Sequence, residues 1–224
     1  MSTPRRTVDP VTYVDADAVA GAGPDVSGGL PPGAALAASA AGGFVVGGLT
    51  QLGQTHLPDA LHPLANSGAP WVLIAFGLAL LARTVWVACL CGALALVGLE
   101  MGYVVIAAMR GFPSAPSTVA FWLTAGVVFG PLAGMAGYYL RARRATLGAV
   151  GGGLVAGIVS GEGLAAYLTV RDTSEPAYWI GQMAVGAIVL ALVVRRTGSL
   201  WATVAFAVGV AGLLATRHVP MFGS

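Results

Sequence analysis

Two glutamates, Glu100 and Glu162, are the residues of this chain whose chemistry most needs an explanation, because both lie deep inside apolar stretches. They are the only acidic residues between positions 59 and 172, and they precede Arg110 and Arg171 by ten and nine residues. At about 1.5 Å of helix per residue, both carboxyls lie roughly 14 Å below the helix ends that these two arginines mark. Ionisable residues at such a depth are functional candidates, and two acids facing one cavity would be protonated, share a proton or hold a cation.

These positions predict a polar pocket around the two glutamates. Asn66, Tyr103 and Gln182 fall at a similar or shallower depth and complete a candidate set that would bind a small solute or an ion. Glu162 is predicted to be the more functional acid, because two glycines flank it and leave room beside its carboxyl, and to face Glu100 across a shared polar space. The alternative is that each glutamate is protonated and only hydrogen-bonds to a neighbouring helix.

A metal site is not expected. His56, Asp59 and His62 are residue types that bind metals, but on a helix the two histidines would lie about 240° apart. Pro58 and Pro63 also disrupt a regular helix in this segment.

Neither an enzyme nor a cofactor is predicted. Ser160-Gly161 follows Ile158 and Val159 instead of completing the Gly-x-Ser-Gly pattern of rhomboid-type intramembrane proteases, and His218 lies at the outer end of the last apolar run. The sequence contains no phosphate-binding loop. Energised transport would therefore need the ATPase of another subunit or an ion gradient.

The composition is that of a membrane protein. Of 224 residues, 57% are hydrophobic and 9% are charged, against about 25% charged residues in soluble domains. The mean hydropathy is +0.82, and the 33 glycines suit closely packed membrane helices. All eleven basic residues counted as Lys or Arg are arginine, with no basic strip that would bind nucleic acid. The lipid bilayer is the expected partner.

The chain is predicted to be an all-α, polytopic transmembrane helical bundle. Residues 1–33 contain several prolines and aspartates but no apolar run, so they are expected to form a disordered cytoplasmic tail; a transmembrane domain follows over 34–217 and a short tail over 218–224. Asn66 or Ser67 is expected to cap the second span, whose first turn contains Pro70. About twenty residues cross the hydrocarbon core. Seven runs are candidate spans: Ala34–Leu52, Gly68–Ala82, Val85–Met109, Thr118–Leu140, Thr146–Thr169, Ala177–Val194 and Gly198–Thr216.

The arginines predict the orientation, because they accumulate on the cytoplasmic side. An inside N-terminus leaves only Arg110, Arg171 and Arg217 outside. It places eight inside: Arg5, Arg6, Arg83, Arg141, Arg143, Arg144, Arg195 and Arg196.

The second, fourth and sixth spans begin alike, at Ala69-Pro70-Trp71, Ala120-Phe121-Trp122 and Ala177-Tyr178-Trp179, and each leads to an inner arginine. This suggests three repeated helical hairpins after a first helix. The alternative is that membrane interfaces select Trp and Arg without any duplication.

Glycines recur every fourth residue in the fourth and fifth spans. Such stripes let helix backbones touch, so the two spans are predicted to pack against each other. The stripes are Gly126, Gly130 and Gly134 in one span and Gly153, Gly157 and Gly161 in the other.

The segments Asn66–Trp71 and Phe129–Gly134, with the Gly161-Glu162 pair, resemble a family of small multi-pass bacterial membrane proteins defined as a domain of unknown function. The resemblance implies a bacterial cytoplasmic-membrane location. The family has no assigned activity that could be carried over to this chain. The size, the glycine-rich helices and Phe129–Pro131 are also similar to the substrate-binding membrane subunits of energy-coupling-factor importers. A membrane protein that binds or transports a small solute through an outward pocket is therefore expected. The alternative is a non-catalytic membrane partner or assembly protein without transport activity. Another membrane subunit or an ATPase subunit is a candidate partner.

Overall fold

The computed structural model describes residues 28–142, 145–170, 172 and 174–216. Apart from 28–33, the expected tails lie outside these residues. All regular secondary structure in the described part is helical, which confirms the predicted fold class. The helices are α2 (Pro32–His56), the 3-10 helix η1 (Asp59–Asn66), α3 (Ala69–Ala79), α4 (Val85–Met109), α5 (Pro116–Arg141), α6 (Ala145–Val170), α7 (Pro176–Thr197) and α8 (Trp201–Thr216).

The seven predicted spans correspond to α2 through α8, and the bounds of α4 agree at both ends. Five described helices, namely α2, α4, α5, α6 and α7, are long and apolar enough to cross a membrane, whereas α3 and α8 are shorter. Local chemistry explains where several helices begin. A proline occupies the first turn of α2, α3, α5 and α7, where its missing N–H leaves no donor unsatisfied. The Thr84 side chain accepts a bond from Val87 at the start of α4.

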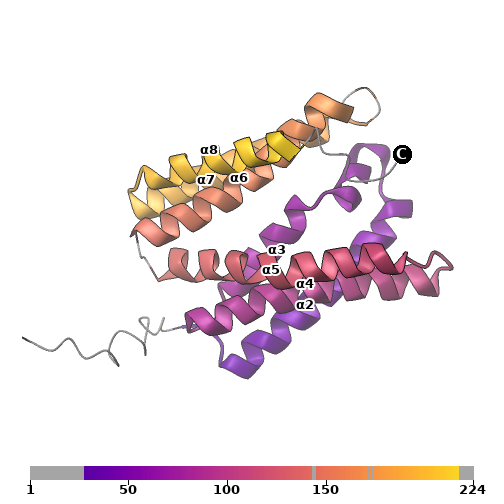
Figure 1. Cartoon of the computed structure of the whole chain (residues 1–224), viewed down its shortest axis with the longest axis horizontal. Helices are drawn as coiled ribbons and strands as arrows, with labels where there is room; N and C mark the ends of the chain where they lie inside the picture. Colours follow the sequence, from indigo (N-terminus) through magenta and orange to yellow (C-terminus); the bar gives the residue numbers. More distant parts are fainter. Residues whose placement is uncertain (1–27, 143–144, 171, 173, 217–224) are drawn as a thin grey trace, which may run out of the picture.

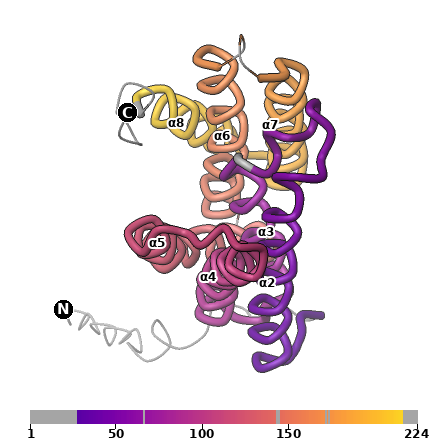
Figure 2. Tube along the Cα trace, turned by 90° about the vertical axis from the view of Figure 1, so that its right-hand side faces the viewer, coloured from indigo at the N-terminus to yellow at the C-terminus, as the bar shows by residue number. Residues whose placement is uncertain are grey.

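The helices form two groups, which are joined by the contact of α5 with α6 and by α3. Figures 1 and 2 show α6, α7 and α8 on one side and α2, α4 and α5 on the other. The most extensively packed pairs are α2 with α4, α4 with α5, α6 with α8 and α6 with α7, and α3 packs against α2, α4, α5 and α6. The hairpin partners α7 and α8 touch only slightly. The three-hairpin repeat stays a prediction, because the helices of the predicted hairpins, α3–α4, α5–α6 and α7–α8, pack less extensively than α4 with α5 or α6 with α7.

Glycines set the closest approach within each group, but the two predicted stripes do not face each other. A Cβ on Gly130 of α5 would lie 2.6 Å from the Cα of Ala93 in α4. A Cβ on Gly157 of α6 would lie 2.3 Å from the carbonyl oxygen of Phe206 in α8. The prediction that the stripes of α5 and α6 pack on each other is therefore wrong. The spacing of the glycines shows that one face of a helix is free of side chains, but it does not show which helix packs on that face. The α5 stripe packs against α4, and the α6 stripe packs against α8.

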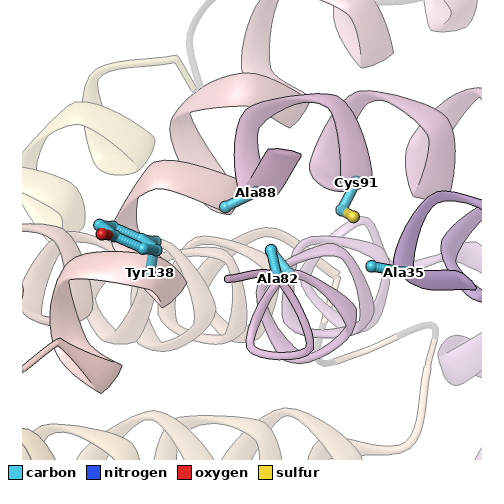
Figure 3. Packing of buried hydrophobic residues seen from close by; sticks show 6 residues of the cluster. Ala35, Ala82, Ala88, Cys91 and Tyr138 are labelled. Atoms are coloured by element: carbon cyan, nitrogen blue, oxygen red, sulfur yellow. The ribbon is translucent and has the colours of Figure 1, made fainter. Parts of the chain in front are cut away.

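The interior is made of small side chains and the perimeter of large ones. Figure 3 shows one buried cluster, in which alanines and Cys91 lie between the helix backbones and Tyr138 is the one large side chain. Trp86 is 77% exposed and Val208 is 61% exposed. Such a distribution is the reverse of that in a soluble monomer and fits a bilayer as the surrounding solvent. The structure thus describes a multi-pass membrane protein.

Arginines gather at one end of the bundle and bind helix carbonyls there. Arg141 donates to the carbonyl of Leu80 at the end of α3, and Arg196 Nε donates to Leu140 O (3.1 Å) in the last turn of α5. Arg83 Nε donates to Gly29 O (2.7 Å), which fixes part of the segment expected to be a tail. Cations near helix C-termini interact favourably with the helix dipole, so these residues also stabilise the fold.

We predict that Gly157→Ala lowers the thermal stability of the purified protein in detergent, because its Cβ must displace the Phe206 carbonyl. Overpacking of this kind costs about 1 to 3 kcal/mol. Gly212→Ala is the matched control, since nothing lies within 4 Å of the Cβ it adds to α8. Unfolding can be followed with a dye that reacts with the buried thiol of Cys91 as it becomes exposed. Equal midpoints for the two variants would contradict the close contact of α6 with α8.

Candidate functional site

The helix α3 is too short to cross the bilayer and therefore begins inside the bundle. Its 11 residues rise about 16 Å, whereas the hydrocarbon core is about 30 Å thick. The chain before it consists of η1, with Pro63 inside, and an irregular stretch through Ser67. Lipid tails offer no hydrogen-bond acceptors, so backbone N–H groups at this depth need acceptors from the protein. The first turn of α3 is therefore a place where the sequence must supply an acceptor.

The Glu162 carboxylate supplies this acceptor from α6. Its Oε1 accepts from the backbone N–H of Gly68 (2.8 Å), and its Oε2 accepts from the N–H of Ala69 (2.7 Å). Pro70 follows and has no N–H to satisfy. A carboxylate at a helix N-terminus is favoured both by these donors and by the helix dipole. Glu162 thus caps a helix that lies more than ninety residues earlier in the chain, with 94 residues separating it from Gly68.

Two buried polar side chains complete the cluster. Gln182 of α7 donates through Nε2 to Glu162 Oε2 (2.9 Å) and to the carbonyl oxygen of Val159 (3.2 Å). The Ser67 hydroxyl lies 2.7 Å from Glu162 Oε2 and 3.0 Å from Gln182 Oε1, and its one proton can be donated to either. Ser67 is 4% exposed and Gln182 is 7% exposed. The cluster ties α3, α6 and α7 together.

Flanking glycines place Glu162 at this point. A Cβ on Gly161 would lie 2.9 Å from the Cα of Val210 in α8, and one on Gly163 would lie 3.0 Å from the carbonyl oxygen of Trp179 in α7. Both neighbouring helices therefore press against α6 beside Glu162, and its side chain extends towards the third neighbour, α3. The room that the sequence suggested for a ligand is taken by helix backbone.

The helix α3 is thus bound at both ends by charged side chains from other helices. Glu162 holds the N–H groups of its first turn, and Arg141 of α5 donates to the Leu80 carbonyl just after its last residue. The expectation that Asn66 or Ser67 caps this helix is wrong: the N-cap residue is Gly68, which has no side chain, and Ser67 bonds to Glu162 instead. The Asn66 side chain lies outside the described part of the structure.

Glu100 lies on the other side of α3 and has a different environment. It is 3% exposed, and within the described residues its carboxyl makes no hydrogen bond or ion pair. The helices that carry the two glutamates, α4 and α6, are not among the pairs that pack together, whereas α3 packs against both. A polar space shared by Glu100 and Glu162 therefore stays a prediction.

Aromatic side chains lie at the level of Glu100, and sequence reasoning missed one of them. Trp71 of α3 contacts Tyr103 of α4 (ring centroids 6.4 Å apart) and Trp122 of α5 (5.8 Å). The Tyr103 hydroxyl donates to Gln54 Oε1 (3.0 Å), so Tyr103 is engaged with α2 and not with Glu162. The indole N–H of Trp71 is buried and has no acceptor within the described residues. The sequence shows Trp71 at the start of the second span, but that position indicated only an anchor at the membrane interface.

Two cavities lie at the end of the bundle opposite the arginines, and neither glutamate lines them. One, of about 380 Å³, is polar and is lined by Asp59, His62, Pro63, Asp172, Ser174, Glu175 and Pro176. The other, of about 560 Å³, is an apolar groove between η1, α3 and α7. Its lining residues are Ala60, Leu61, Leu64, Ala69, Pro70, Leu73, Val159, Ala177, Tyr178, Gly181, Gln182 and Val185. Gln182 connects this groove to the Glu162 cluster.

These features define a helical, multi-pass membrane protein in which a half-buried carboxyl of one helix caps the start of another. The sequence profile of a family of unknown function, DUF6518, matches residues 28–221, and the chain belongs to this family. The predicted membership of a family of that kind is confirmed. No curated protein and no solved structure matches the chain. The similarity to importer subunits stays an expectation.

We predict that Glu162→Gln destabilises the protein, because the amide puts an NH₂ donor among groups that are themselves donors. Hydrogen bonds to a charged group contribute about 1.5 to 3 kcal/mol each, so we expect a loss of about 2 to 4 kcal/mol in thermal or denaturant unfolding. Glu175→Gln, at an exposed position, removes the same charge and is the control. If the two variants unfold together, Glu162 does not hold the start of α3.

Proposed function

We propose that the protein binds a small, mainly apolar solute in the groove between η1, α3 and α7. The observation that carries the proposal is the groove itself, with a volume of about 560 Å³. Small-molecule sites in proteins typically occupy 300 to 1,000 Å³ and combine an apolar lining with a few polar groups. Tyr178 and Gln182 are the polar side chains of this groove that can fix the orientation of a solute.

The contacts of Gln182 suggest how an occupant would act on the bundle. Gln182 lines the groove and also donates to Glu162, which caps α3, and Ala69 and Pro70 of the first turn of α3 form another part of the wall. If α3 has two positions in the bundle, a solute that binds more tightly to one of them shifts the equilibrium towards that position. Half-length helices whose N-termini lie at membrane depth form substrate sites in secondary transporters, and this supports transport as the outcome of binding.

We further propose that the arginine-rich end faces the cytoplasm of a bacterial cell, so that the groove faces outwards, since arginines are enriched on the inner side. Single cysteines at Ala142 and Ala115, in a chain lacking Cys89 and Cys91, test this orientation. An impermeant thiol reagent added to intact cells should modify position 115 and leave position 142 unmodified. The reverse pattern would show an outside N-terminus.

A second function is that of a non-catalytic partner in a membrane assembly. It is favoured by the hydrogen bonds of Glu162, which are all made to other groups of the protein. All four groups around this carboxylate belong to the protein, and neither glutamate lines the two cavities. In that case no small molecule would stabilise the isolated chain, and the groove would contact another membrane subunit.

We predict that a screen of small apolar and amphipathic compounds by thermal shift finds a ligand whose effect requires the groove. A ligand at one hundred times its Kd stabilises the folded state by about 2.7 kcal/mol. Gly181→Leu fills the groove from a position where a Cβ meets nothing within 4 Å, so it should keep the fold and abolish the shift.

The matched control for this screen is Gly212→Leu, which adds the same side chain to an equally open position of α8 away from the groove. It should keep the ligand-induced shift. A ligand that stabilises the Gly181→Leu variant as strongly as the wild type would place binding elsewhere and contradict the proposal.

A further inference from the structure

The packing of α4 against α5 places Glu100 at a defined position in their interface. A Cβ on Gly134 would lie 2.0 Å from the carbonyl oxygen of Ala88, one on Gly92 would lie 2.0 Å from that of Gly130, and one on Gly126 would lie 3.2 Å from the Leu96 Cβ. The contacts thus advance by four residues on α4 while they go back by four residues on α5. The next step of this register pairs Glu100 with Trp122.

At this step Trp122 follows the last glycine of the α5 stripe, and on α4 a carboxyl follows Leu96. Trp122 contacts Trp71, and Trp71 contacts Tyr103, which lies one turn beyond Glu100 on α4. The Glu100 side chain is 3% exposed, so the protein encloses it almost completely. The register of the two helices places it beside Trp122, the first of these three aromatic residues.

No charged side chain on the packed helices faces Glu100. The helix α2 carries a single titratable residue, His56, in its last turn, and α3 carries none. The titratable residues of α5 are Tyr138, Tyr139 and Arg141, all at the opposite end of that helix from Trp122. Besides Glu100, the titratable residues of α4 are Cys89, Cys91 and Tyr103.

The nearest arginine along the chain, Arg110, is occupied elsewhere. It follows the last residue of α4, about 15 Å beyond Glu100 along the helix. Its guanidinium donates to Gln51 Oε1 (2.9 Å) and Thr55 Oγ1 (2.6 Å) at the end of α2. Among the described residues Glu100 therefore has no cation to pair with, in contrast to Glu162, which has four donor groups and a helix N-terminus.

We infer that Glu100 is a proton-binding site within the membrane, protonated in the arrangement seen here and able to release its proton reversibly at alkaline pH. A buried carboxylate without donors or a counter-charge is strongly disfavoured and becomes neutral by taking up a proton. The unpartnered indole N–H of Trp71 lies in the same aromatic cluster and offers a donor to the ionised form after a side-chain rotation. The inference does not depend on the groove or on its solute.

Dicyclohexylcarbodiimide, an apolar reagent that attacks protonated carboxyls in membranes, provides the first test. The acid proton moves to a carbodiimide nitrogen while the carboxyl oxygen bonds to the central carbon, and the adduct rearranges to a stable N-acylurea without a leaving group. With wild-type protein in liposomes, mass spectrometry should find the adduct on the peptide that contains Glu100 and not on the peptide that contains Glu162. Glu100→Gln should lose the adduct, and Glu175→Gln should keep it.

Infrared difference spectroscopy tests the protonation of Glu100 even if the carbodiimide does not reach the interface between α4 and α5. The wild type minus Glu100→Gln spectrum at neutral pH should show the C=O stretch of a protonated carboxyl, and this band should disappear reversibly at alkaline pH while the helical amide band is unchanged. Absence of the band at neutral pH would overturn the inference. A band that persists at every pH at which the protein stays folded would also overturn it, because the proton would then never be released.

Discussion

The position of α3 depends on one interaction, the Glu162 carboxylate at the N-terminus of that helix. A helix that begins inside hydrocarbon exposes backbone N–H groups that lipid cannot satisfy. Glu162 accepts from two of them, and Gln182 and Ser67 hold the carboxylate in place. Because the glutamate belongs to α6 and the capped helix packs against α2, α4 and α5, these bonds link the two groups of helices in addition to the direct contact of α5 with α6.

Close packing at glycines explains why chemistry is confined to a few positions. Between lipid-surrounded helices there is little hydrophobic driving force, so association relies on backbone contact and buried hydrogen bonds. Glycine contacts join α4 to α5 and α6 to α8 and leave little room for polar groups. The two acids lie beside such contacts: Glu162 between two glycines of α6 that contact α8 and α7, and Glu100 one step beyond the last glycine contact between α4 and α5. Their different partners give them different roles, a fixed cap and a proton-binding site.

The sequence predicted the helices well and the contacts between them less well. Apolar runs separated by arginines, prolines and glycines located all seven helices, since these features depend on the bilayer and on local backbone chemistry. Glu162 and Gln182 were recognised because polar residues in apolar runs need a reason. The 3-10 helix η1, the partners of the glycine stripes and the cap itself were missed. Glu162 bonds to backbone N–H groups, which every residue carries, so no side-chain pattern marks the place where such a cap will form.

Hydrogen exchange tests the Glu162 cap most directly. Mass spectrometry of wild type and Glu162→Gln in detergent would compare deuterium uptake by a peptide spanning the start of α3 with uptake by a peptide from the middle of α4. The account predicts that the variant exchanges faster in the α3 peptide, through Gly68 and Ala69, while the α4 peptide keeps its protection. Equal protection of the α3 peptide in both proteins would show that another group satisfies these amides, and would contradict the central role given to Glu162.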